Sequence, residues 1–81
     1  MTDEIHELDC VALLEPLETT HCFTGERIRL RPGQRGTVVL DHGPSTKEVE
    51  FSDRTGRAYA ILAVPTAHLL RLCDAPEPAV A

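Results

Sequence analysis

Four arginines that lie close together in the sequence are the residues best suited to bind another molecule. They are Arg27, Arg29, Arg31 and Arg35. The planar guanidinium group forms paired hydrogen bonds with a carboxylate or a phosphate. Ile28 and Leu30 alternate with the first three, which predicts a strand with arginines on one face and apolar side chains on the other. We expect this arginine stripe, with Phe23 nearby, to contact a binding partner.

The stripe also has a simpler interpretation as a solvated strand face. Glu48 and Glu50 are expected to point outward from another strand, where they would pair with the arginines. Exposed ion pairs of this kind contribute only about 0–1 kcal/mol each. The sequence leaves both interpretations open.

Cysteine and histidine residues form no recognisable metal-binding or catalytic motif. Cys10, Cys22 and Cys73 are odd in number and lack C-x-x-C spacing, and His21 directly precedes Cys22, an awkward arrangement for chelating one ion. A Cys22 nucleophile with His21 or His68 as base would need an orienting group and an oxyanion site, for which the chain shows no signal. Cys10 is expected to be a small buried residue. The sequence therefore predicts no catalytic residue, no metal, no cofactor and no enzyme activity.

Short strands separated by turns must position the arginines. Strand-type patterns cover residues 9–15, 34–41, 47–52, 57–64 and 69–72. Asp53 and Gly56 suit a type I turn between the third and fourth strands, and Pro65 suits the start of a single 3₁₀ turn before the last. These elements predict an all-β fold, a small five-stranded antiparallel SH3-like barrel with a long first loop at residues 16–33. A loop of this length is usually functional or folded on itself.

Length and composition indicate one small domain. The chain has 81 residues, of which 42% are hydrophobic and only 4% aromatic. We expect a flexible N-terminus at residues 1–8, the barrel at residues 9–73 and a disordered tail at residues 74–81. With one Tyr, two Phe and no Trp, the chain cannot build the aromatic groove that binds proline-rich peptides.

The net charge of −5 and the pI of about 5.2 give no general attraction to nucleic acid or to anionic membranes. The acidic N-terminus does not resemble a signal peptide. No apolar run approaches the roughly 18 residues of a membrane span. We therefore expect a cytoplasmic protein without a membrane or nucleic-acid partner.

Several segments, taken in order, resemble a bacterial family catalogued as domain of unknown function four-nine-two-six, DUF4926. The segments span residues 8–15, 33–39, 48–53, 59–62 and 69–72. The resemblance implies an SH3-like barrel that accompanies another gene product, in some cases within an antitoxin-like pair, and it supplies no catalytic residues. The run from Gly33 to Val38 also resembles the KOW element, a small barrel that touches RNA.

These observations predict a non-enzymatic protein-interaction module that binds one dedicated partner. The product of a neighbouring gene is the candidate partner, and the role would be antitoxin-like or regulatory. The first alternative is a KOW-like protein that contacts RNA, which the acidic charge disfavours. The second is weak self-association through an uncovered edge of the barrel.

Overall fold

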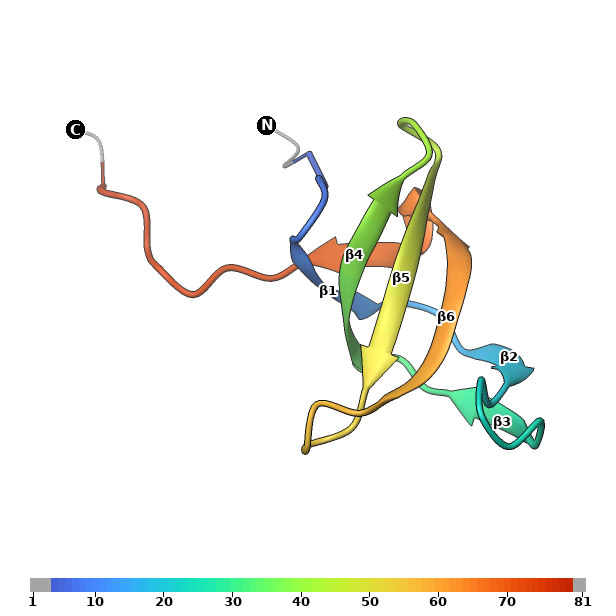
Figure 1. Cartoon of the computed structure of the whole chain (residues 1–81). Helices are drawn as coiled ribbons and strands as arrows, with labels where there is room; N and C mark the ends of the chain where they lie inside the picture. Colours follow the sequence, from blue (N-terminus) through green and yellow to red (C-terminus); the bar gives the residue numbers. More distant parts are fainter. Residues whose placement is uncertain (1–3, 80–81) are drawn as a thin grey trace.

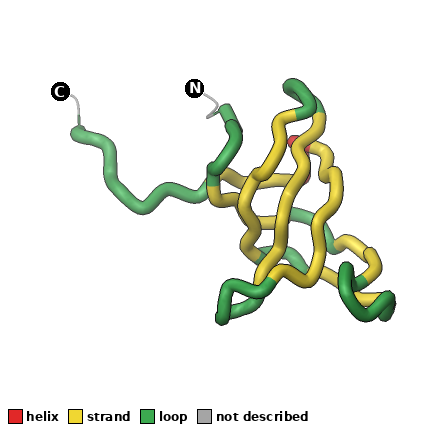
Figure 2. The backbone as a smooth tube through the Cα atoms, viewed as in Figure 1, coloured by secondary structure: helices red, strands yellow, loops and turns green. Residues whose placement is uncertain are grey.

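The computed structural model describes residues 4–79 and contains strands, turns and one short 3₁₀ helix (Figures 1 and 2). In chain order the elements are β1 (Cys10–Leu13), β2 (Leu17–Thr20), β3 (Arg27–Leu30), β4 (Arg35–Asp41), β5 (Thr46–Ser52), β6 (Ala58–Pro65), η1 (Thr66–His68) and β7 (Leu69–Arg71). The all-β prediction and the single 3₁₀ turn before the last strand are confirmed. The predictions for residues 1–3 and 80–81 lie outside the described residues.

Five strands form one antiparallel sheet in the order β6-β5-β4-β1-β7. β4, β5 and β6 make a continuous meander, and β1 and β7 run across it at a steep angle (Figure 1). Within residues 4–79 the sheet does not close into a barrel, because its edge strands β6 and β7 are not neighbours. β6 ends at Pro65, which has no N–H to donate, and η1 then leads into a strand of only three residues.

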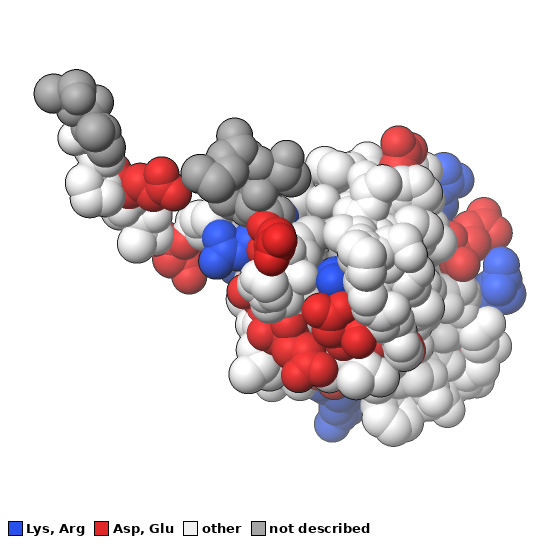
Figure 3. Space-filling view, turned by 90° about the horizontal axis from the view of Figure 1, so that it is seen from above, with Lys and Arg blue, Asp and Glu red and all other residues white. Residues whose placement is uncertain are grey.

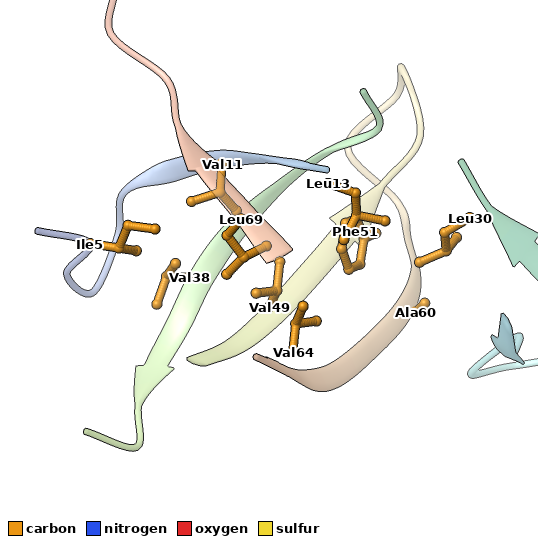
Figure 4. Packing of buried hydrophobic residues seen from close by; sticks show 10 residues of the cluster. All are labelled: Ile5, Val11, Leu13, Leu30, Val38, Val49, Phe51, Ala60, Val64 and Leu69. Carbon is orange, nitrogen blue, oxygen red and sulfur yellow. The ribbon is translucent and has the colours of Figure 1, made fainter. Parts of the chain in front are cut away.

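Apolar side chains from the meander and from the β1–β7 pair form the core (Figure 4). Val49 and Phe51 point inward from β5 and are fully buried, whereas Glu48 and Glu50 point outward, as the alternation predicts. Gly36 lies directly opposite Phe51. A Cβ atom there would lie 2.6 Å from the Val49 Cγ1 atom and 3.0 Å from the Glu50 carbonyl oxygen, so glycine permits a close approach of two strands.

The segment before β1 and the segment after β7 differ in their contacts with the sheet. Ile5 is buried in the core cluster, and the Leu8 N–H donates to the Val38 carbonyl oxygen at 2.7 Å. Leu8 is 79% exposed and has a φ of 71°, a left-handed conformation that is unfavourable for leucine. Residues 74–79 form no strand or helix and extend away from the sheet (Figure 1).

The expected long loop at residues 16–33 contains a second sheet. β2 and β3 pair as an antiparallel hairpin, and only β3 has the alternating pattern that predicts a strand. β2 has the sequence Leu-Glu-Thr-Thr, which carries one apolar residue and therefore no clear period. β2 is a strand because its backbone pairs with β3, and its own sequence does not predict this.

Two turns are closed by backbone hydrogen bonds, and the first is the turn that Asp53 and Gly56 predict. The Gly56 N–H donates to the Asp53 carbonyl oxygen at 3.0 Å, and the Gln34 N–H donates to the Arg31 carbonyl oxygen at 3.0 Å. Gly33 has a φ of 92°, which a residue with a Cβ atom adopts only at a cost. This second turn redirects the chain between β3 and β4.

Candidate functional site

The β2–β3 hairpin has one inward and one outward face. Thr19 pairs with Ile28, and Leu17 pairs with Leu30, which is 1% exposed and belongs to the core. Glu18, Arg27 and Arg29 alternate with these residues and are exposed. The hairpin therefore attaches to the core along one face and presents the arginines on the other.

Tyr59 of β6 fixes the hairpin at two points. The Cys22 N–H donates to the Tyr59 carbonyl oxygen at 2.9 Å. Beyond the other end of the hairpin, the Gln34 side-chain amide donates to the Tyr59 hydroxyl oxygen at 2.6 Å. One partly buried tyrosine thus connects both ends of the hairpin to the meander.

An imidazole organises the hairpin tip at residues 21–26. The His21 N–H donates to the Glu26 carbonyl oxygen at 2.8 Å, and the Nδ1 atom of His21 accepts from the backbone N–H groups of Phe23 at 3.1 Å and Thr24 at 3.3 Å. The Phe23 ring lies 6.3 Å from the imidazole and is 75% exposed. An aromatic side chain is therefore held outward by a hydrogen-bonded loop.

The three arginines of the hairpin differ in their partners. Arg27 forms an exposed ion pair with Glu18 at 3.3 Å. Arg29 and Arg31 line an open hollow with Pro16 and Pro32, and within residues 4–79 their side chains form no hydrogen bond or ion pair. The hairpin therefore leaves two guanidinium groups available to another molecule.

Glu48 and Glu50 do not pair with Arg27, Arg29 or Arg31, so that part of the simpler interpretation is wrong, whereas the exposure of these arginines agrees with a solvated strand face. The Glu48 carboxylate lies 2.7 Å from the Nε2 atom of His42, and the Glu50 carboxylate accepts from the Ser52 hydroxyl at 3.3 Å. Both glutamates lie on β5 of the main sheet, whereas the stripe lies on the separate hairpin.

Arg35 is separated from the other arginines. It lies on β4, opposite Ala12 of β1, and lines a different hollow that Cys10 and Glu50 share. The turn at Gly33 sends the chain from the hairpin into the main sheet, so a spacing of four residues in the sequence does not keep Arg35 on the same face. The structure groups Arg27, Arg29 and Arg31 on one hairpin face, with Phe23 at the tip of the same hairpin.

The sequence analysis missed a buried lysine at the other end of the meander. Lys47 is 4% exposed, and its Nζ atom donates to the Asp41 Oδ1 atom and to the Gly43 carbonyl oxygen, both at 2.7 Å. The Lys47 ammonium and the Gly43 N–H hold the pKa of Asp41 below its ordinary value. Lys47 precedes Val49 and Phe51 at intervals of two residues, so the strand alternation places all three on the inward face. This alternation is the sequence feature that could have predicted the burial of Lys47.

A hollow of about 520 Å³ opens beside this lysine. Its walls include Ile5, Pro44 and Thr66, whose Oγ1 atom is buried without a hydrogen-bond partner among the described residues. The Lys47 ammonium already donates to Asp41 and Gly43. The role of Lys47 is therefore to fix the β4–β5 loop.

The family model described as a domain of unknown function, DUF4926, matches residues 7–71. The chain belongs to the DUF4926 family. No curated protein and no solved structure matches it significantly. The DUF4926 region covers all seven strands of the described chain, and both the hairpin and Lys47 lie within it.

Residues 4–79 contain no group of three or more His, Cys, Asp or Glu side chains that could hold a metal ion. Cys10, Cys22 and Cys73 are free and exposed. Burial of Cys10 was a wrong prediction, because Cys10 precedes the buried stretch of β1. No helix in the described residues is long and apolar enough to cross a membrane.

Charge is unevenly distributed over the DUF4926 fold. Seen from the end that carries the β4–β5 loop, acidic side chains gather near the middle, and basic side chains lie mainly at the periphery (Figure 3).

Proposed function

We propose that this DUF4926 protein is a non-enzymatic interaction module whose β2–β3 hairpin binds one dedicated protein partner. The observation that carries the proposal is the combination, on one fixed hairpin, of the outward Phe23 ring with Arg29 and Arg31, which have no side-chain partner within residues 4–79. Aromatic and arginine side chains dominate the energetics of many protein interfaces. A partner surface with carboxylates beside an apolar recess would match this arrangement.

A protein partner fits the whole chain better than a nucleic acid does. The net charge of −5 opposes association with a phosphate backbone, and the hairpin offers a single exposed aromatic ring for stacking. We further propose that the partner is the product of a neighbouring bacterial gene, that the two proteins meet in the cytoplasm, and that the role is antitoxin-like or regulatory.

The test begins with affinity capture of the tagged protein from its native host, with and without nuclease, followed by calorimetry with the purified partner. The double variant R29E/R31E is expected to weaken binding by more than about tenfold, and Phe23→Ala by a similar factor. Arg54 and Arg57 are also exposed but lie at the β5–β6 turn, so R54E/R57E makes the same charge change elsewhere. This control is expected to bind normally.

The outcomes separate the candidate functions. Equal loss of affinity in both double variants would show a general charge effect and refute a hairpin-specific surface. Captured proteins that disappear after nuclease treatment would favour the KOW-like alternative, and a steep decrease of affinity with salt would support it further.

A further inference from the structure

β6 is an edge strand whose outer side is largely uncovered. β5 pairs with it along one side. On the other side, within residues 4–79, the hairpin contributes the Cys22 N–H, which bonds to the Tyr59 carbonyl oxygen near the start of the strand. Beyond Tyr59 the outer edge has no neighbouring strand in the described chain, and Figure 1 shows it open.

The register reveals which backbone groups face this open side. Thr46 lies opposite Pro65, which has no N–H, and the Thr66 N–H donates to the Ser45 carbonyl oxygen at 2.9 Å. Thr46 and Pro65 are therefore a non-hydrogen-bonded pair. The register continues without a shift to Phe51, so pairs alternate along the strand. Ile61 and Ala63 consequently direct their N–H and C=O groups away from β5.

Between Tyr59 and Pro65, the exposed edge carries no charge that would discourage pairing. Natural edge strands commonly carry a lysine or another charge that discourages addition of a further strand. β6 has no charged residue between Ala58 and Pro65. The hairpin contact at Tyr59 and the proline at position 65 bound an open stretch at residues 60–64, which is about 17 Å long.

Side chains beside the edge define what an added strand should carry. On the outer face, Ile61 is 48% exposed and lies opposite Glu50, and Ala63 lies opposite Glu48. On the inner face, Leu62 is partly buried against the core. A strand next to β6 would place its outer side chains beside Ile61 and Ala63, where long basic side chains can reach across to the two carboxylates of β5, and its inner side chains near an apolar surface.

We propose that the open edge of β6 binds an extended segment of a partner protein, in which lysine or arginine alternates with apolar residues. The partner's backbone would pair with Ile61 and Ala63, its basic side chains would reach Glu48 and Glu50, and its apolar side chains would cover Leu62. Charge favours this occupant over a second copy of the chain. The outer faces of β5 and β6 in a second copy would offer Glu48 and Glu50 no basic partner, and each copy carries a net charge of −5. This surface is independent of the hairpin.

Amide hydrogen exchange by NMR tests the geometry first. In the free protein, the amides of Ile61 and Ala63 should exchange much faster than those of Leu62 and Val64. The probe is then a short synthetic peptide in which lysine alternates with valine. Its addition should slow exchange at Ile61 and Ala63 by about tenfold or more, whereas a peptide with glutamate in place of lysine should have no effect.

Variants locate the binding surface on the fold. I61K places a positive charge on the outer face and is expected to lower the affinity for the lysine peptide by about tenfold, and E50Q is expected to lower it less. Leu70 of β7 is 52% exposed, so L70K is a matched control that should bind normally. Melting curves of I61K and L70K should be similar.

Four outcomes would overturn the proposal. The first is equal protection of Ile61 and Leu62 in the free protein, and the second is equal binding of the lysine and glutamate peptides. The third is slower exchange at Ile61 and Ala63 with increasing protein concentration alone, which would identify a second copy as the occupant. Loss of peptide binding in R29E/R31E but not in I61K would move the site to the hairpin.

Discussion

The β4–β5–β6 meander and the β2–β3 hairpin use the same alternating pattern for different purposes. In the meander the inward residues Val38, Val49, Phe51 and Val64 are buried to 1% exposure or less. In the hairpin only Leu30 is fully buried, and Ile28 and Leu17 pack at the margin of the core. Substitutions of the outward residues of the hairpin, which is half-buried and fixed through Tyr59, should therefore cost little stability. Substitutions of the inward residues of the meander should cost much more.

The strongest test of this difference removes a large side chain from each region. Phe51→Ala is expected to lower the free energy of unfolding by about 3–5 kcal/mol, because a cavity replaces a fully buried ring. Ile28→Ala, in the hairpin, should cost about 1–2 kcal/mol, since its side chain is only partly buried. Urea unfolding measures both values. A cost for Ile28→Ala equal to that of Phe51→Ala would place the hairpin within the essential core.

A second prediction concerns close packing inside the meander. Gly36→Ala should cost about 1–3 kcal/mol, because the new methyl group meets the buried Val49 side chain at 2.6 Å. In a Val49→Ala background this cost should decrease, since one of the obstructing groups is gone.

Gly33 provides the control in the turn after the hairpin. A Cβ atom there would have open space around it among the described residues, so Gly33→Ala costs stability through its positive φ alone. Its cost should be the same in the wild-type and the Val49→Ala backgrounds. A double-mutant cycle that finds coupling for Gly33 but not for Gly36 would contradict the packing explanation.

Acid should weaken the meander through its two turns. The Thr55 hydroxyl, followed by the backbone N–H groups of Arg57 and Thr55, lowers the pKa of Asp53 below 3.8, and the Lys47 ammonium lowers the pKa of Asp41. The unfolded chain therefore binds more protons at low pH than the folded one. The stabilisation is fully present above the ordinary carboxyl pKa and is lost as the pH falls through the lowered values.

Urea unfolding between neutral pH and about pH 2 checks this dependence. Asp53→Asn should reduce the decrease of the free energy of unfolding at low pH. The part of that decrease that comes from Asp41 should remain. An unchanged slope in this variant would show that the Asp53 turn does not contribute to acid sensitivity.

The smallest effect is expected on the outward face of the hairpin. Arg27→Ala breaks the ion pair with Glu18, whose two side chains are 68% and 64% exposed, and should change the free energy of unfolding by no more than about 0.5 kcal/mol. Glu18→Ala should behave in the same way. A loss above about 1 kcal/mol in either variant would mean that the outward face supports the fold and is not free to diverge.

Local patterns predicted most of the main sheet but not its edges. The alternation around Val49 and Phe51, the Asp53–Gly56 turn and the 3₁₀ turn after Pro65 are short-range features with their own physical causes. β2 escaped prediction because pairing with β3, and not its own sequence, makes it a strand. The sequence allowed for an uncovered edge but did not place it on β6, because no local feature determines whether two distant strands meet.

The grouping of the arginines was predicted only where they share a strand. Arg27, Arg29 and Arg31 lie on one face because they alternate on β3 and just beyond its end. Arg35 does not join them, because the turn at Gly33 moves the chain into another sheet. Lys47 occupies an inward position in the alternation of β5. Its burial was not predicted, because lysine is seldom buried.

The pairing of β1 with β7 determines when this protein can become complete during its synthesis. Arg71 donates to the Asp9 carboxylate at 3.2 Å across a separation of 62 residues, and β1 lies inside the sheet while β7 forms its edge. Contacts this distant in sequence form late and slow folding. A nascent chain can build the meander and pair β1 with β4 as it emerges from the ribosome, but the other side of β1 stays unpaired until β7 is released.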